Sequence, residues 1–338
     1  SRNTRRLRQM GARIFIGHKP ENVEGADLLV VSSAISERNR ELVRARELGV
    51  EVLPRAAMLN VIMEDGKGIA VAGTHGKTTT TSMIAMIMRE SGLDPTYVVG
   101  GELNDVGSNA NAGSGGHVIA EADESDGSFL LLRPWAEVVT NVEEDHLDFF
   151  ADMEAVRSYF RRFVSLLPQD GLLVLYGDDP GAASLKGCCA AQEVTFGDGE
   201  GNDYRSVHVH LFPGGSAFQI FRGGENLGEV KLNIPGQHNV RNAMAALALT
   251  ISLGVDFAAA ARALETFRGV ERRYQFVGEV SGIRFVDDYA HHPSEIKATL
   301  EAACRGKRDG RIIAVFQPHR YSRLAHLAKE FGSAFKKS

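Results

Sequence analysis

The sequence has little of what disulfide-built, membrane-spanning or nucleic-acid-binding proteins require. Three cysteines stand in 338 residues, two of them adjacent (Cys188 and Cys189), so we expect neither a disulfide framework nor a zinc site. Apolar runs fall short of the roughly 20 residues that cross a bilayer, and no secretory signal is predicted. The net charge of -5 gives no reason to expect nucleic-acid binding. This composition predicts a reducing, cytoplasmic setting without a membrane or nucleic-acid partner.

What the sequence does contain is the composition of a globular protein. Hydrophobic residues make up 43% of the chain, which is enough to build apolar cores. A length of 338 residues predicts two or three domains rather than one.

The most informative segment is a glycine-rich one, Val71-Ala-Gly-Thr-His-Gly-Lys-Thr78. It lies between an apolar strand-like run at 69–72 and a helix-like run at 79–90. In such a turn backbone N–H groups face an anion, the lysine neutralises it, and the threonine hydroxyl can hold Mg²⁺. Val71 stands where the general pattern has glycine, so the loop is a short variant. It predicts a nucleoside triphosphate site; the alternative is a Gly/Thr-rich turn with a solvated lysine.

Apolar strands alternating with helical segments predict a mainly parallel sheet, in which ligands gather beyond the carboxyl ends of the strands. Polar residues follow three of these strands: Lys77 and Thr78, then Glu121 and Asp123, then Asp145 and His146. A carboxylate and an imidazole at this edge are able to hold metal ions that bridge phosphates. The alternatives are an N-cap or loop acid for Glu121 and a satisfied loop histidine for His146. The nearby acids are interpreted as loop acids: Asp123, Glu124, Asp126, Glu143 and Glu144.

The remaining elements are predicted from periodicity and turn residues. Strands are expected at 12–16, 26–31, 51–53, 117–122, 136–140, 172–176, 283–286 and 311–316. Helices are expected at 3–10, 38–48, 239–253 and 257–267, with Gly49 as a C-cap. Alternating runs at 207–211, 217–221 and 228–232, separated by Gly-Gly pairs, predict antiparallel hairpins added to the sheet. His208 and His210 are interpreted as a solvated strand face.

Several segments together resemble the Mur ligase family of peptidoglycan synthesis. They are Gly-Thr-His-Gly-Lys-Thr-Thr-Thr-Thr, Glu-Ala-Asp-Glu-Ser-Asp, Asn-Val-Glu-Glu-Asp-His, Gly-Gln-His-Asn-Val-Arg-Asn, Asp-Asp-Tyr-Ala-His-His-Pro and Phe-Gln-Pro-His-Arg-Tyr-Ser-Arg. The resemblance covers essentially the whole chain. The phosphate loop is shared with folylpolyglutamate synthase. Segments 287–293 and 316–323 resemble the member that adds L-alanine to UDP-N-acetylmuramate.

The resemblance implies an α/β fold of three domains. A UDP-substrate domain at 1–66 precedes a central ATP-binding domain at 67–269 with a parallel P-loop sheet and antiparallel additions. An amino-acid-binding domain at 270–338 follows, and both flanking domains are expected to be partial and Rossmann-like. The family's first domain opens with a Gly-rich loop that this sequence lacks, and its third domain has further strands. We therefore expect a fragment that lacks both ends.

The resemblance also implies a mechanism and site residues. The muramyl carboxylate attacks the γ-phosphate of ATP, and the amine of L-alanine attacks the resulting acyl phosphate. The catalytic residues implied are Lys77, Glu121, His146 and Arg320, and the Mg²⁺ ligands are Thr78, Glu121 and His146. The ATP-binding residues implied are Gly73, Thr74, His75, Gly76, Lys77, Thr78, Thr79, His238, Asn239, Asn242, Arg273 and Asp288; Asn239 is alternatively a helix cap. The substrate-binding residues implied are Ser32, Ser33, Ser125, Tyr289, His291, Arg320 and Arg323.

Other functions fit parts of the same pattern. A ligase of the same family that takes a murein tripeptide shares the loop. From another class, a P-loop nucleotide-binding module or an inactive fragment is the alternative. For the ligase we expect ATP and Mg²⁺ as cofactors, UDP-N-acetylmuramate and L-alanine as substrates, and a monomer or weak homodimer.

Overall fold

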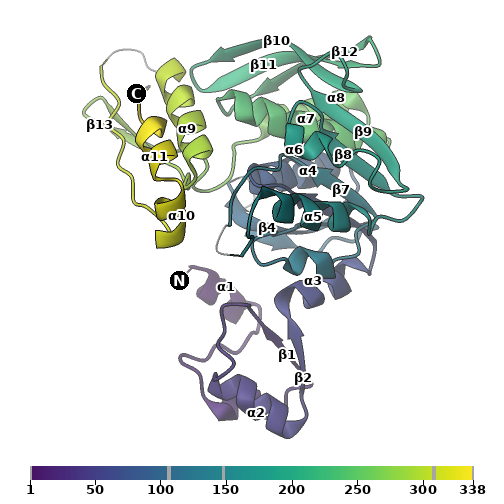
Figure 1. The fold of residues 1–338 in the computed structure, drawn as a ribbon, viewed down its shortest axis with the longest axis vertical. Coiled ribbons are helices and arrows are strands. Elements are labelled where there is room, and N and C mark those ends of the chain that lie inside the picture. Colours follow the sequence, from purple (N-terminus) through teal and green to yellow (C-terminus); the bar gives the residue numbers. More distant parts are fainter. Residues whose placement is uncertain (1, 105–107, 147–148, 307–309, 337–338) are drawn as a thin grey trace. The chain divides into compact units, whose positions relative to one another are not determined.

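The computed structural model describes residues 2–104, 108–146, 149–306 and 310–336. Within them the chain forms two compact units, Ser1–Ile62 and Met63–Ser338. Figure 1 labels most of their helices and strands. No helix among the described residues is both long enough and apolar enough to span a membrane.

The first unit contains a small parallel βαβ arrangement. Its elements are α1 (Arg2–Gln9), η1 (Pro20–Val23), β1 (Leu28–Val31), α2 (Arg40–Leu48), β2 (Glu51–Pro54) and α3 (Arg55–Met63), the last ending at the unit boundary. Strands β1 and β2 pair directly in parallel, and α2 connects them along the chain. The side chain of Asn39 caps the start of α2, and Gly49 ends it in the left-handed conformation, as predicted.

The predicted strand at 12–16 is wrong. These residues are irregular, and the side chains of Phe15 and Ile16 are 58% and 82% exposed. A strand is held by hydrogen bonds to a neighbour, and within the described residues none pairs with this run.

The second unit is built on a ten-stranded sheet with the order β12-β11-β10-β9-β8-β7-β3-β6-β4-β5. Its strands are β3 (Lys67–Ala72), β4 (Thr96–Leu103), β5 (Ser108–Asn111), β6 (His117–Glu121), β7 (Ala136–Val139), β8 (Leu172–Tyr176), β9 (Gln192–Gly197), β10 (Tyr204–Phe212), β11 (Gly215–Arg222) and β12 (Glu225–Leu232). Neighbouring strands run parallel throughout the stretch β4-β6-β3-β7-β8-β9-β10, taken in sheet order. The remaining strands, β5, β11 and β12, are antiparallel additions at the two edges. The predicted sheet is confirmed, and His208 and His210 are exposed as expected.

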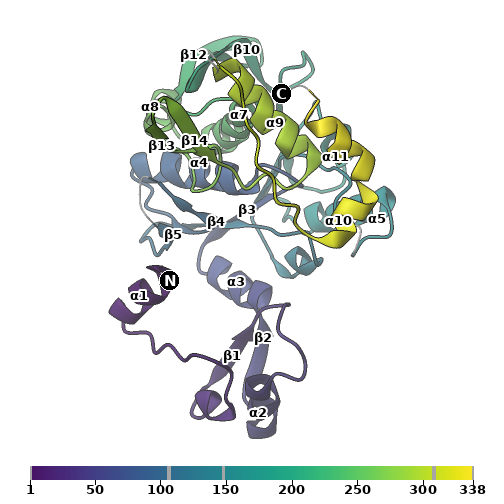
Figure 2. The same ribbon diagram turned by 90° about the vertical axis from the view of Figure 1, so that its left-hand side faces the viewer.

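Helices bury the apolar centre of this sheet. They are α4 (Lys77–Glu90), α5 (Met153–Val164), α6 (Pro180–Ala183), α7 (Gln237–Ser252) and α8 (Phe257–Thr266), with the short η2 (Ser128–Leu131). Helix α4 contacts β3, β4 and β6 on one side and α7 and α8 on the other, so it lies between two layers (Figure 2). Because it is covered all round, its residues from Thr78 to Met88 are all buried. This burial fixes the helix whose first residue is Lys77.

The last part of this unit is smaller. It contains β13 (Gln275–Val280), β14 (Ile283–Asp287), α9 (Pro293–Gly306), α10 (Tyr321–His326) and α11 (Ala328–Ala334). Strands β13 and β14 form an antiparallel hairpin, and α9 packs on α11 around Ile296, Leu300 and Phe331 (Figure 1).

The predicted strand at 311–316 is wrong. No strand among the described residues pairs with it, so its backbone is irregular. Phe316 instead packs its ring on Phe331 and Phe335. Ile312 and Phe316 therefore join a core, whereas Ile313 and Val315 are exposed. The hydrogen-bonded neighbour that would make the run a strand is not among the described residues.

Candidate functional site

The phosphate loop joins β3 to α4 and requires glycine at two positions. Gly73 has a φ of 126°, and a side chain there would collide with the hydroxyl of Thr140. Gly76 has a φ of 86°, and a side chain there would collide with the side-chain oxygen of Asn242. Both conformations are left-handed ones that other residues rarely adopt. The two glycines thus let the loop close against β7 and α7.

The segment that follows β7 holds the loop in shape. Asn141 accepts the backbone N–H of His75 at 2.9 Å and donates to the carbonyl of His75 at 3.1 Å. The backbone N–H of Glu143 donates to the hydroxyl of Thr74 at 2.8 Å. Sequence reasoning missed Asn141 as a site residue, although its place at the end of a predicted strand was available as a signal.

Lys77 is held by a buried carboxylate. Its Nζ donates to Glu124 Oε1 and Oε2, each at 2.9 Å, and to the carbonyl of Gly73 at 2.5 Å. Burial lowers the pKa of Lys77, but the Glu124 carboxylate outweighs this, and the net shift is upward. Glu124 lies in the loop after β6, as interpreted, but it is 2% exposed and paired with Lys77, which the interpretation did not include. An acidic run gave no basis for choosing it over its neighbours.

Thr78 and Glu121 lie together at the same edge. The Thr78 hydroxyl donates to Glu121 Oε2 at 3.1 Å, and the backbone N–H of Gly100 donates to Oε1 at 2.6 Å. Burial raises the pKa of Glu121. A hydroxyl and a carboxylate beside Lys77 are the oxygen donors that Mg²⁺ prefers, so this pair fits the ion.

In the part of the chain that the structure describes, the ring of His146 makes its polar contacts with Glu124 and Asp145 and not with Thr78 or Glu121. Its Nε2 lies 3.8 Å from Glu124 Oε1 and 3.6 Å from Asp145 Oδ2, and its φ is 56°. Its Nδ1 is buried and has no hydrogen-bond partner among the described residues. A buried polar atom without a protein partner is uncommon, so His146 does not fit the alternative of a satisfied loop histidine.

A pocket of about 380 Å³ lies beside the phosphate loop. It brings together many of the predicted nucleotide residues, which come from three stretches of the chain. They are His75, Gly76, Thr78 and Thr79 of the loop region, His238, Asn239 and Asn242 of α7, and Arg273 and Asp288 of the last part. Gly73, Thr74 and Lys77 belong to the same loop but are not among the residues that line this cavity.

The α7 wall of the pocket is polar, and its one formal charge among the lining residues is the guanidinium of Arg241. Burial, with Arg241 nearby, lowers the pKa of His238 to about 4, so its ring is uncharged at neutral pH. Asn239 donates to the carbonyl of Pro235 at 2.7 Å, and no side chain caps α7, so the capping alternative for Asn239 is wrong. Sequence reasoning missed Tyr176, whose ring faces Arg241 at 5.5 Å in the same pocket lining.

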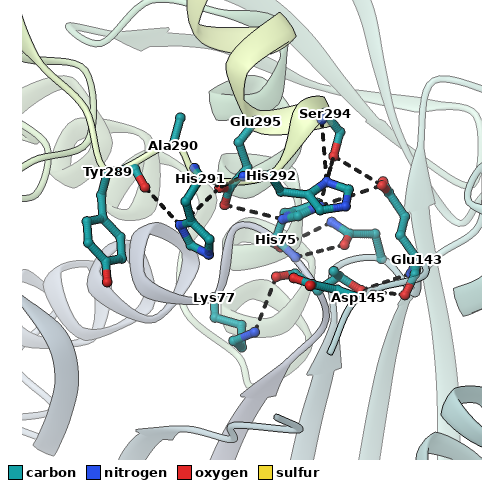
Figure 3. A network of polar contacts seen from close by, with 12 residues as sticks. His75, Lys77, Glu143, Asp145, Tyr289, Ala290, His291, His292, Ser294 and Glu295 are labelled. Carbon is teal, nitrogen blue, oxygen red and sulfur yellow. Dashed lines mark hydrogen bonds and ion pairs between the residues drawn. The ribbon is translucent and has the colours of Figure 1, made fainter. Parts of the chain in front are cut away.

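The opposite wall comes from the last part of the chain. Asp288 accepts the backbone N–H groups of Tyr274 at 2.8 Å and Ala290 at 2.6 Å. Burial raises the pKa of Asp288. His291 Nδ1 lies 2.9 Å from the backbone carbonyl of Tyr289, so this turn positions the His291 ring (Figure 3).

Two polar contacts join the central sheet to the last part of the chain. Near α9, His75 is hydrogen-bonded to Ser294 and lies in ion-pair contact with Glu295, and Ser294 also donates a hydrogen bond to Glu143 (Figure 3). Near α10, Arg323 pairs with Asp145, and Arg320 and Arg323 line a small cavity together with Asp145 and His146. Sequence reasoning missed Ser294 and Glu295, and it named Asp145 and Glu143 without these partners.

The predicted serines are not among the residues that line the pocket beside the phosphate loop. Ser125 is in the turn after β6, where its backbone N–H donates to Asp123 Oδ1 at 3.0 Å. Ser32 and Ser33 follow β1 in the first unit, where the Ser32 hydroxyl accepts the backbone N–H of Ala34 at 3.3 Å.

Family models and known proteins match this chain over its length. The Mur ligase family catalytic domain matches residues 1–67, the Mur ligase middle domain 71–250, and the Mur ligase glutamate ligase domain 272–338. A UDP-N-acetylmuramate–L-alanine ligase of Desulforamulus reducens is 48% identical over 332 residues, covering 98% of this chain and 72% of the relative. One of Rubrobacter xylanophilus is 50% identical over 333 residues, covering 98% and 73%.

Solved structures agree with these matches. The UDP-N-acetylmuramate–alanine ligase of Thermotoga maritima has a TM-score of 0.85 at 32% identity, over 99% of this chain and 75% of that one. A UDP-N-acetylmuramate:L-alanyl-γ-D-glutamyl-meso-diaminopimelate ligase from Neisseria meningitides has a TM-score of 0.71 at 28% identity, over 79% and 87%. With the phosphate loop and its partners in place, these similarities show that the chain belongs to the Mur ligase family.

Proposed function

We propose that this chain catalyses the ATP-dependent joining of L-alanine to UDP-N-acetylmuramate, a step of peptidoglycan precursor synthesis. The observation that carries the proposal is the pocket that the phosphate loop shares with α9 and Asp288, because an amide ligase must bring nucleotide and acceptor groups together. The relatives named as alanine ligases, 48–50% identical over 98% of the chain, support the choice of substrates.

In the first step the muramyl carboxylate attacks the γ-phosphate of ATP and releases ADP. Lys77 and the loop Gly73–Thr79 hold the phosphates, Arg273 reaches them from the far wall, and Asp288 binds the ribose. The adenine side is formed by His238, Asn239 and Asn242. Thr78 and Glu121 would hold Mg²⁺, with His146 at a second ion, and the ions would neutralise charge on the phosphate oxygens.

In the second step the amine of L-alanine attacks the acyl phosphate carbonyl, the C–N bond forms, and inorganic phosphate leaves. Arg320 supplies a guanidinium group suited to a carboxylate, and Arg323 contributes its Nη1, because its Nε and Nη2 are held by Asp145. Tyr289 and His291 line the approach. We assign a substrate-binding role to Ser125 in the second unit and, separately, to Ser32 and Ser33 in the first unit.

The organisation proposed with this function is a UDP-substrate domain at 1–66, an ATP-binding domain at 67–269 and an amino-acid-binding domain at 270–338. We propose a cytoplasmic enzyme, monomeric or weakly dimeric, that uses small-molecule substrates and no nucleic-acid or membrane partner.

The test is phosphate release from ATP with UDP-N-acetylmuramate and L-alanine added singly and together. Release only with both is expected, and ATP turnover indifferent to both substrates would overturn the proposal. Lys77→Ala should abolish release, whereas Lys186→Ala, at an exposed position, should leave it unchanged.

A second candidate amine is the tripeptide L-alanyl-γ-D-glutamyl-meso-diaminopimelate. It is a candidate because the chain is also similar to the Neisseria ligase named for this tripeptide. Replacing L-alanine by this tripeptide in the same assay decides between the two. Faster release with the tripeptide would assign the chain to the reaction of the tripeptide ligase.

A further inference from the structure

His75 belongs to the phosphate loop, yet its ring is bonded to the last part of the chain. Its Nε2 lies 2.9 Å from the hydroxyl of Ser294, and its Nδ1 lies 3.3 Å from Glu295 Oε1. On its own side of the contact, Glu143 Oε2 lies 3.5 Å from Nε2. The imidazole therefore bridges the loop after β7 and the start of α9 (Figure 3).

The Ser294 hydroxyl occupies the centre of this contact. It lies 2.6 Å from Nδ1 of His292 and donates to Glu143 Oε2 at 3.2 Å. His75, Glu143 and His292 would otherwise form a set of donors suited to a divalent metal. Because the hydroxyl already bonds all three, the cluster is a hydrogen-bonded junction rather than an open metal site.

Glu295 ties the junction to the backbone that leads into α9. Its Oε2 accepts the backbone N–H groups of His291 at 2.9 Å and His292 at 3.2 Å. Arg273 Nη1 lies 3.7 Å from its Oε1. A carboxylate held at this many points moves only with its helix. Its contact with His75 therefore fixes the position of the first turn of α9 against the phosphate loop.

The charges on both sides suit a protonated His75. Burial lowers its pKa, but Glu143 and Glu295 outweigh this and raise it to about 9. The third neighbour, His292, is neutral because burial and the charge of His75 lower its pKa to about 4. Burial alone would raise the pKa of Glu295, yet His75, His291 and Arg273 hold it well below its ordinary value.

We infer that His75 and Glu295 are a positioning pair, which seats α9 against the phosphate loop and so completes the nucleotide pocket. The wall that depends on this seating is formed by Ser294, Glu295, Ala298 and Thr299. The pair acts on ATP through the wall, as a positioning device rather than as a catalytic group. This inference rests on the proposed function in one respect, namely that the ligand of the pocket is a nucleotide.

The first experiment titrates the histidine side chains of the unmodified chain by NMR. One imidazole should titrate near pH 9; His75→Gln should remove that signal, and Glu295→Gln should shift it to lower pH. Because the pKa of His75 is raised, the pair's contribution to stability is full below the ordinary value of 6.5 and is lost as pH rises through about 9, where the imidazole loses its proton. If every imidazole titrated below about pH 7, the pairing would be absent and the inference overturned.

The second experiment is a double-mutant cycle on the affinity for a non-hydrolysable ATP analogue, measured by calorimetry at pH 7. His75→Gln and Glu295→Gln should each weaken binding about tenfold, and the double variant should be no weaker than either single one. His75→Lys keeps a charge for Glu295 and should restore part of the affinity. His210→Gln, at an exposed position on β10, is the matched control and should change nothing. Additive losses, or none, would overturn the inference.

These outcomes are distinct from those of the ligase assay. A chain that binds the analogue and shows the non-additive cycle but needs neither substrate for phosphate release keeps the positioning pair and loses the ligase function. Phosphate release that depends on both substrates, together with additive losses in the double-mutant cycle, keeps the ligase function and overturns the positioning pair. Absence of nucleotide binding in the unmodified chain overturns both. The NMR titration of the unmodified chain stands even where a variant fails to fold.

Discussion

Arg323 on α10 and Asp145 after β7 form a two-point ion pair although they are 178 positions apart. The Nε–Oδ1 distance is 3.0 Å and the Nη2–Oδ2 distance is 3.1 Å, and both side chains are buried. A planar guanidinium and a carboxylate meeting in this way fix orientation as well as distance. The last part of the chain is thus attached to the sheet edge at α10 as well as at α9.

The first prediction concerns this pair. Asp145→Asn should lower the free energy of unfolding by about 3–5 kcal/mol, because it leaves the buried guanidinium without a counter-charge. Urea denaturation followed by circular dichroism measures the loss. Glu154→Gln is the control, since it breaks the exposed pair with Arg161 and should cost at most about 1 kcal/mol. Equal, small losses in both variants would mean that the Asp145 pair contributes no more than a surface contact.

The second prediction concerns the phosphate loop. Gly187 has a φ of 79° with open space around it, so Gly187→Ala should cost only about 1–2 kcal/mol of conformational energy. Gly73→Ala adds a collision with Thr140 and should cost about 1–3 kcal/mol more, with loss of nucleotide binding. Urea midpoints and calorimetric affinities of the two variants test this. A Gly73→Ala protein that still binds the nucleotide analogue would contradict it.

The third prediction concerns Glu137, which lies fully buried on β7 between β3 and β8. Both of its carboxyl oxygens lack a partner among the described residues, and burial raises its pKa well above 4.5. The folded state therefore keeps the proton while the unfolded chain releases it, and stability falls as pH rises above about 4.5. Glu137→Leu removes this dependence and should gain stability over the unmodified chain.

That gain should grow between pH 5 and pH 8 by up to about 1.4 kcal/mol per unit. Urea denaturation at each pH, followed by the fluorescence of the single tryptophan, Trp135, measures it. Glu225→Leu, at an exposed position at the start of β12, is the control and should show no such growth. A pH-independent difference for Glu137→Leu would show that the carboxyl is hydrated or paired.

Much of the fold was predictable because its signals are local. The loop at 71–78 between strand and helix, the Gly-Gly pairs at 214–215 and 223–224, and Gly49 at a helix end each act through a few neighbouring residues. The strands expected at 12–16 and 311–316 failed for the opposite reason. An apolar run becomes a strand only when another strand pairs with it, and that partner is not encoded in the run.

The candidate site divides in the same way. The sequence placed Thr78 and Glu121 at one sheet edge, and the structure joins them by a hydrogen bond. It did not single out Glu124 from the acids around it, because burial beside Lys77 depends on how the turn after β6 folds back.

By itself the sequence determined the phosphate loop, the chemical groups at the strand ends and the family to which they are similar. Only the tertiary structure decided which groups are partners: Lys77 with Glu124, His75 with Glu295, and Arg323 with Asp145. The reason is physical. The loop's shape follows from φ angles and steric contacts within a few residues, whereas each pair is brought together by chain crossings that no local pattern specifies.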